Sequence, residues 1–312
     1  MVNQLLSSRR SSLKKYLTPE ELLQQTLGLP EEVLQHILCM LPLRALLQAG
    51  LVCRLWHRLA SWPPLWSRLR LAVRPGSLAS MPEVLALPRL LNLHRLRVRA
   101  VDASLLQAIL LHTGLKELDM RCTDLSILPA DLLARVVGRM ESVVMFDTRI
   151  TKEQGEAVLR SAGHPDSQLK VLNIGDNSLE GVSGEALGGL GRLERLEIAE
   201  ARMDTVQARA LMEGITGDSN LRHLNLANTL LTGVPAILLA GVVAALDRLV
   251  VRRCGLAREQ LDALLEATHI MEELDIGGNK AARDLQGEAV DRARARVRRL
   301  TLSTPGLPIV GS

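Results

Sequence analysis

The chain has 312 residues, an apolar fraction of 47% and a formal net charge of +4. This length and apolar content suffice for a large core or a row of stacked units, and they exclude a mainly disordered chain. The weak positive charge does not indicate nucleic acid, and no apolar run reaches the about 20 residues of a membrane span. Without a secretory segment, we expect reduced cysteines, no membrane partner, and a place in the cytosol or the nucleus.

The first predicted elements are helices. Thr18-Pro19-Glu20-Glu21 is typical of a helix start, with a capping Thr and a Pro at the first helical position. A second helix is predicted to follow Leu29-Pro30, because apolar residues then recur at helical spacing as far as Pro42. Further apolar residues at helical spacing predict more helices up to Trp62-Pro63-Pro64, where two prolines break the pattern.

The three tryptophans of the chain, Trp56, Trp62 and Trp66, all lie at the end of this helical region. The rest of the chain contains one Tyr and one Phe. The tryptophan cluster therefore predicts a local core that differs from the core of the remaining chain. Large aromatic side chains are also favoured at protein interfaces.

From Trp66 onward a motif recurs in which apolar residues occupy positions 1, 4 and 6. Its copies begin at Trp66, Leu93, Leu115, Met140, Leu169, Leu193, Leu221, Leu246 and Met271, with an imperfect copy at Val297. The starts are 22 to 29 residues apart, a period typical of leucine-rich repeats. Positions 4 and 6 are predicted to point from a strand into the core, and a helix follows each strand. Such units bury their apolar faces only when stacked, which predicts a curved solenoid.

Two further regularities support the repeat. Position 9 holds a small polar side chain or Cys, able to bond loop backbone, at Thr123, Thr148, Asn177, Thr229, Cys254 and Asn279. Residues 126–140 match residues 232–246 at seven of fifteen positions, with an offset of 106 residues that the following stretches share. The repeats are therefore predicted to alternate between two subtypes, each pair spanning about 53 residues.

The helical region resembles an F-box. The residues that carry this pattern are Leu29, Pro30, Val33, Ile37, Leu41, Pro42, Leu46, Val52, Cys53, Arg54, Trp56, Leu59, Leu65 and Trp66. Two positions depart from it: Leu38 stands where an aromatic residue is frequent, and Ala45 where an acidic residue is frequent. From residue 29 to about residue 302, the chain resembles the F-box and leucine-rich-repeat protein family.

This resemblance implies an α/β leucine-rich-repeat solenoid, with parallel strands on the concave face and helices on the convex face, preceded by a small all-α F-box. The expected domains are a flexible basic tail at 1–17, a helical F-box region at 18–65 with its core at 29–66, repeats at 66–303, and a C-terminal tail at 304–312. The implied function is that of the substrate-recognition subunit of an SCF-type cullin ubiquitin ligase. Such a receptor supplies placement, so we expect no enzymatic activity and no cofactor.

In this family the F-box docks on a Skp-family adaptor, which joins it to a cullin, and the repeats hold the substrate. The resemblance implies adaptor-binding residues at Leu29, Pro30, Val33, Ile37, Leu41, Pro42, Leu46, Val52 and Trp56. Two alternatives stay open. The F-box could be degenerate, leaving a repeat module that binds or inhibits a protein without ubiquitin. The helices could also simply cap the end of the solenoid.

On the strands, positions 3, 5 and 7 are predicted to face outward on the concave side. There three apolar residues form an island beside charged residues, and we expect both groups to contribute to substrate binding. The island consists of Val144, Phe146 and Val171, and the charged residues are Arg97, Arg99, Asp119 and Arg121. The pairs His36–Cys39 and Cys53–His57 have spacings that would suit zinc, but packing in the F-box explains them, so no metal is predicted.

Overall fold

The computed structural model describes residues 29–68, 70–73, 93–99, 103–110, 114–215, 218–283 and 285–302. The chain divides into an N-terminal unit, Met1–Leu69, and a repeat unit, Arg70–Ser312. This division differs from the boundary that the sequence predicts between residues 65 and 66. The two predicted tails and the helix start at Thr18 lie outside the described residues.

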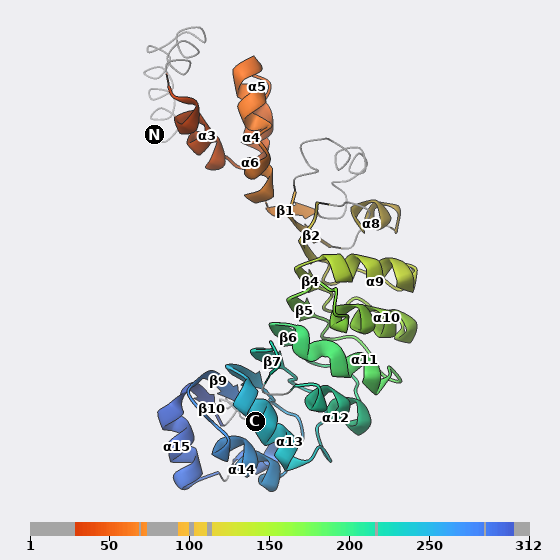
Figure 1. Ribbon diagram of the computed structural model, residues 1–312, viewed down its shortest axis with the longest axis vertical. Coiled ribbons are helices and arrows are strands. Elements are labelled where there is room, and N and C mark those ends of the chain that lie inside the picture. The colour runs from red at the N-terminus through yellow and green to blue at the C-terminus, as the bar shows by residue number, and fades with distance from the viewer. Residues whose placement is uncertain are drawn as a thin grey trace, which may run out of the picture. The chain divides into compact units, whose positions relative to one another are not determined.

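The described part of the N-terminal unit consists of helices (Figure 1): α3 (Glu31–Cys39), α4 (Leu43–Ala49), α5 (Arg54–Ala60) and α6 (Pro63–Arg68). Pro30 and Pro42 stand at the N-caps of α3 and α4, where a missing N–H costs nothing. Cys53 caps α5, because its Sγ accepts a hydrogen bond from the Trp56 N–H at 3.5 Å. The buried core of this unit is formed by Leu34, Leu38, Leu46, Ala49, Leu59, Ala60, Leu65 and Trp66.

Trp66 lies in α6, so the prediction that it opens the first repeat strand was wrong. The first strand is β1 (Arg70–Val73), and it pairs with β2 (Arg95–Val98) so that Leu71 is the partner of Leu96. The first copy of the motif therefore starts two residues later than predicted. The error has a simple cause: apolar residues three apart, as at Trp66, fit a helix face as well as motif positions 1 and 4.

The repeat unit contains one parallel sheet, with ten strands in the described part of the chain arranged in sequence order. After β1 and β2 these are β3 (Glu117–Asp119), β4 (Ser142–Val144), β5 (Val171–Asn173), β6 (Arg195–Glu197), β7 (His223–Asn225), β8 (Arg248–Val250), β9 (Met271–Asp275) and β10 (Val297–Thr301). From β2 to β9, the residues at position 4 are partners of one another and are buried, from Leu96 to Leu274. Their burial confirms the predicted inward-facing positions.

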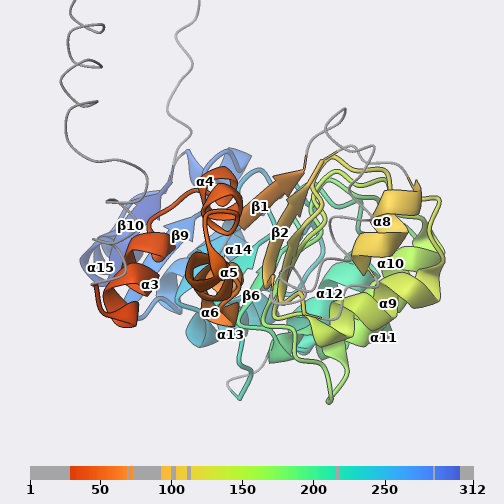
Figure 2. The same cartoon turned by 90° about the horizontal axis from the view of Figure 1, so that it is seen from above.

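The helices of the repeat unit lie outside the curved ladder of strands (Figures 1 and 2). They are α8 (Ala103–Leu110), α9 (Ala130–Arg139), α10 (Lys152–Gly163), α11 (Gly184–Gly188), α12 (Thr205–Glu213), α13 (Ala236–Ala245), α14 (Arg258–Glu266) and α15 (Glu288–Arg296), with 3-10 turns η2 (Gly189–Arg192) and η3 (Lys280–Ala282). This arrangement confirms the predicted α/β solenoid. No helix in the described ranges is long and apolar enough to cross a membrane.

The alternation of two repeat subtypes is confirmed by three buried glutamines 53 residues apart, Gln154, Gln207 and Gln260. Each lies in the first turn of its helix, α10, α12 or α14, and its Oε1 accepts a hydrogen bond from the N-cap N–H. Each Nε2 donates to two carbonyls of the preceding repeat, which for Gln207 are those of Leu179 and Val182, both at 2.7 Å. These glutamines therefore join each helix of this subtype to the repeat before it.

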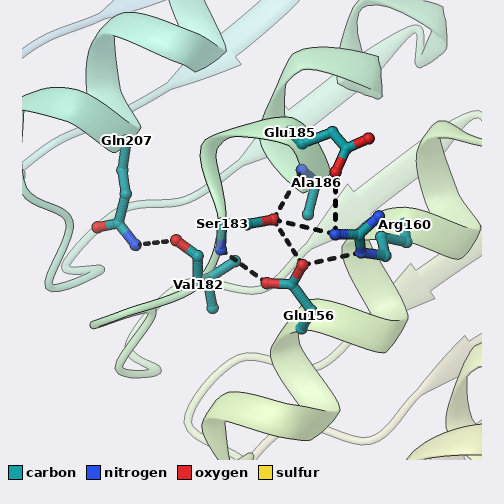
Figure 3. Close-up of polar contacts among 7 residues, drawn as sticks. All are labelled: Glu156, Arg160, Val182, Ser183, Glu185, Ala186 and Gln207. Carbon is teal, nitrogen blue, oxygen red and sulfur yellow. Dashed lines mark hydrogen bonds and ion pairs between the residues drawn. The ribbon is translucent and has the colours of Figure 1, made fainter.

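A polar network also joins neighbouring helices on the outer side of the repeats (Figure 3). The Glu156 carboxylate of α10 accepts hydrogen bonds from the N–H and the hydroxyl of Ser183, which caps α11. Arg160 pairs with both Glu156 and Glu185. Burial alone would raise the pKa of Glu156, but the Ser183 hydrogen bonds and Arg160 lower it below its ordinary value. This network fixes the start of α11, a helix too short to be stable alone.

Position 9 of the motif forms the predicted contacts with loop backbone. The Asn177 amide bridges two repeats: its Nδ2 donates to the carbonyls of Met145, Ile174 and Gly175. Asn279 does the same 102 residues further on, donating to the carbonyls of Val251 and Ile276. At Cys254 the thiol donates to the Leu226 carbonyl at 3.1 Å, and burial raises the pKa of this thiol to about 12. Cys254 is therefore a structural thiol rather than a reactive one.

One helix of the glutamine subtype lacks a side-chain cap. Thr151 Oγ1 and Asp204 Oδ1 each accept a hydrogen bond at the start of their helices, but Ala257 at the start of α14 has no acceptor. We expect Ala257→Asp to raise the free energy of unfolding by about 1 kcal/mol, because it supplies this acceptor. Urea denaturation followed by far-UV circular dichroism measures the change. As the control, Asp204→Ala should lower the free energy of unfolding by a similar amount. If Asp204→Ala destabilises the protein but Ala257→Asp leaves its stability unchanged, the prediction is contradicted.

Candidate adaptor-docking and substrate-binding surfaces

One side of α3 presents apolar side chains to solvent. Val33 and Ile37 are 43% and 41% exposed, and Met40 is 71% exposed. Val33 and Ile37, four residues apart, lie along one face of the helix, and Met40 follows three residues later at its C-cap. Leu34 and Leu38, on the adjacent face of α3, are buried in the unit's core. The helix thus divides its apolar residues between a core and an unpaired surface, which we call the α3 stripe (Val33, Ile37 and Met40).

Eight of the nine predicted adaptor-binding residues lie at least partly at the surface. Leu29, Pro30, Val33, Ile37, Pro42 and Val52 are exposed, and Leu41 and Trp56 are half-buried. Leu46 is the exception, because it is 1% exposed and packs in the core of the N-terminal unit. Sequence reasoning missed Met40 and Leu51, which is 84% exposed. Met40 had a usable signal, since it continues the helical spacing of Val33 and Ile37.

Of the two histidine and cysteine pairs, Cys53 and His57 have structural contacts of their own. Cys53 caps α5, and the His57 Nδ1 lies 3.0 Å from the Gly50 carbonyl oxygen. Within the described ranges, no three or more His, Cys, Asp or Glu side chains form a group that could hold a metal ion. Arg58 of α5 forms an exposed ion pair with Glu31 at the start of α3, a contact of little energetic weight.

On the strand face of the repeats, the structure brings Arg97, Asp119 and Arg121 together. The Asp119 carboxylate accepts hydrogen bonds from Nε of Arg97 at 2.8 Å and from Nε of Arg121 at 2.9 Å. Burial would raise the pKa of Asp119, but the Arg121 hydrogen bonds and the two guanidinium charges lower it. Arg99, also predicted here, is exposed directly after β2. The predicted charged residues thus form a paired cluster, not a set of free charges.

The predicted apolar island adjoins this charged cluster, because Val144 of β4 is the partner of Asp119 of β3. Val144, Phe146 and Val171 are all half-buried. Phe146 packs over Gly175, where a Cβ would lie 3.2 Å from its Cδ2. The only Phe of the chain therefore rests on the backbone of the next repeat and keeps part of its ring in solvent.

Sequence reasoning missed a hollow on the same face of the sheet, between β6 and β9. Its volume is about 200 Å³, and it is lined by Arg195, Leu196, Glu197, His223, Leu224, Asn225, Arg248, Val250 and Glu273. None of the seven predicted substrate-binding residues lines it. A signal was present: position 3 of three consecutive copies holds Arg195, His223 and Arg248.

Known proteins are similar to parts of this chain. Residues 26–72 match the model of the F-box-like family. No curated protein matches the chain. A solved structure, that of an LRR protein of Leptospira interrogans, is similar with 18% identity and a TM-score of 0.44, covering 68% of this chain and 49% of that one. The match thus spans about half of the Leptospira protein. The chain carries an F-box-like domain followed by an α/β repeat solenoid of the leucine-rich-repeat type.

Proposed function

We propose that this chain is the substrate-recognition subunit of an SCF-type cullin ubiquitin ligase. In this proposal, the F-box-like domain docks on a Skp-family adaptor, and the strand face of the repeats holds a protein substrate for ubiquitination. The chain itself is not a catalyst: it contributes by placing the substrate near the transferring enzyme. The charged cluster of Arg97, Asp119 and Arg121 and the island around Phe146 form part of the substrate surface. The complex would act in the cytosol or the nucleus.

The α3 stripe is the observation that supports adaptor docking most directly. Exposed apolar side chains at spacings of four and three residues are the anchors by which a helix enters an apolar groove of a partner. Val33 and Ile37 each keep about two fifths of their surface in solvent although Leu34 and Leu38 beside them are buried. Covering such a stripe would remove apolar surface from water, which stabilises a complex by about 25 cal/mol per Å² before the costs of association.

The test is co-purification of the full chain with a Skp-family adaptor after coexpression. The wild-type chain should retain the adaptor in a stoichiometric complex. Val33→Asp and Ile37→Asp should each weaken retention by about ten-fold or more, because a carboxylate would have to be desolvated at the interface. Gln48→Asp is the matched control, since Gln48 is exposed on α4 and lies outside the α3 stripe. Tryptophan fluorescence checks that each variant is folded.

Failure of the wild-type chain to retain the adaptor would overturn the proposal. The repeats would then act as a binding or inhibitor module without ubiquitin. Ala45→Glu separates the reasons for such a failure, because Ala45 stands where F-boxes often carry an acidic residue. If Ala45→Glu restores retention, the F-box is degenerate at this position. Equal losses in Val33→Asp and Gln48→Asp would also contradict docking through the α3 stripe.

A further inference from the structure

The hollow between β6 and β9 contains a row of three basic side chains. Arg195 is the Cα partner of His223, and His223 is the partner of Arg248. Neighbouring strands lie about 4.8 Å apart, so the three side chains leave the same face of the sheet at short intervals. All three line the hollow, together with Asn225 and Glu273. This arrangement places three side chains with nitrogen donors around one small space.

The two arginines keep part of their donor capacity. Arg195 uses Nε and one terminal nitrogen on the Glu197 carboxylate, with the Nε contact at 2.7 Å. Arg248 directs the same edge of its guanidinium to Glu272. An arginine has five N–H donors, so each of these side chains has a second terminal nitrogen for another acceptor. The carboxylates therefore hold the two guanidinium groups in position, and each guanidinium group keeps N–H donors for a further acceptor.

The charges that face His223 come from three strands. They are Arg195 and Glu197 from β6, Asp247 and Arg248 at β8, and Glu272 and Glu273 from β9. Burial lowers the pKa of His223, and the charges of Arg248 and Arg195 lower it further, against smaller opposing effects of Glu272 and Asp247. Burial and the two arginines thus favour the neutral form of the ring, and Arg195 and Arg248 supply positive charge on either side of it. An anion placed beside it would find favourable charge.

We propose that this hollow holds an anionic side chain, a carboxylate or a phosphoryl group, of the protein segment that the repeats bind. Arg195 and Arg248 donate hydrogen bonds to the anion from both sides, and His223 lies between them. Glu273, which has no ion-pair partner among the described residues, limits the anion to the side of the hollow near β7. The inference deepens the proposed function, because it names the chemistry of the substrate at the strand face.

The test uses the full chain and four pools of random hexapeptides whose central residue is fixed as Glu, phosphoserine, Gln or Lys. Retention of each pool on immobilised protein is measured at low salt. The Glu or the phosphoserine pool should be retained about ten-fold more than the Gln pool, since charge-assisted hydrogen bonds are about twice as strong as neutral ones. The stronger of the two anionic pools identifies the anion. Equal retention of the Glu, phosphoserine and Gln pools, or preference for the Lys pool, would overturn the proposal.

Variants locate the binding. Arg195→Gln and Arg248→Gln should each remove most of the preference for the anionic pool, and Glu273→Gln should strengthen it, because a repelling carboxylate is lost. Arg209→Gln is the matched control, since Arg209 lies in α12 and pairs with Glu213. Retention of the Glu pool, whose carboxylate stays ionised over this range, should also rise between pH 8 and pH 6, because the anion favours protonated His223, and His223→Gln should abolish this rise. Unchanged retention in Arg195→Gln and Arg248→Gln would place the anion elsewhere. Adaptor docking is not involved, so a negative result here leaves the adaptor experiment intact.

Discussion

Asn177→Ala is expected to lower the free energy of unfolding of the repeat unit by about 4 kcal/mol. The Asn177 side chain is 4% exposed and serves two repeats at once. Its Nδ2 donates to three carbonyls, with the Met145 contact at 2.6 Å, and its Oδ1 accepts from the Thr148 N–H at 3.1 Å. An alanine would leave these buried backbone groups without partners, and each unsatisfied group costs about 1–3 kcal/mol.

The measurement is urea denaturation followed by two signals. Far-UV circular dichroism reports mainly the repeats, whereas tryptophan fluorescence reports the N-terminal unit, because all three tryptophans lie there. The dichroism midpoint should fall while the fluorescence midpoint changes little. The transition should also broaden, since a solenoid weakened at one repeat can unfold in parts. Asn220→Ala, an exposed asparagine in the same unit, should shift stability by less than about 0.5 kcal/mol. Similar effects of both substitutions would contradict the bridging role of Asn177.

Most of the repeat fold could be predicted because burial leaves a periodic record in the sequence. The residue at motif position 4 faces the core in each copy, as Leu118 and Leu172 do. The spacing between apolar residues therefore repeats along the sequence. Gln154, Gln207 and Gln260 are constrained by backbone groups of the preceding repeat, and Gln154 and Gln260 recur at the offset of 106 residues in the stretches that follow the match. Packing and hydrogen-bonding requirements that recur in each repeat can therefore be predicted from the sequence.

Other features could not be predicted, because they depend on contacts that the repeat pattern does not encode. Leu46 is buried although it belongs to the F-box pattern, since that pattern contains core and surface residues alike. The hollow depends on where the side chains of Arg195, His223 and Arg248 turn once their strands are paired. Each residue alone resembles an ordinary solvated position on a strand. Their shared motif position predicts that the three residues lie side by side, but it does not predict that their side chains leave a hollow between them.

The proposed function depends on two surfaces with different chemistry. The α3 stripe is apolar and would be covered permanently by an adaptor, as suits a stable subunit contact. The hollow at β6–β9 is polar and rimmed by charges, which favours selective and reversible binding of a substrate. A receptor that works by placement needs both properties, one on each unit. Substitutions in one unit should therefore impair one of the two binding activities and leave the other measurable.

Trp66→Ala is expected to destabilise the N-terminal unit by about 3–5 kcal/mol, a large share of the stability of a domain this small. The Trp66 side chain is 1% exposed, and its Nε1–H donates to the Ala60 carbonyl at 2.8 Å. The variant should lose adaptor retention while the far-UV signal of the repeats persists. Fluorescence of Trp56 and Trp62 should show the N-terminal unit unfolded in low urea.

Two further variants separate packing from hydrogen bonding at this position. Trp66→Phe keeps a ring in the core but leaves the buried Ala60 carbonyl without its donor, so a loss of about 1–2 kcal/mol is expected. Trp62→Ala serves as the control, because Trp62 is 38% exposed and should contribute less than about 1 kcal/mol. If Trp62→Ala destabilised the unit as much as Trp66→Ala, the aromatic core would be centred on the other ring. Adaptor retention in Trp66→Phe, measured where the unit is still folded, should match the wild type, because the ring at position 66 is buried and lies outside the α3 stripe.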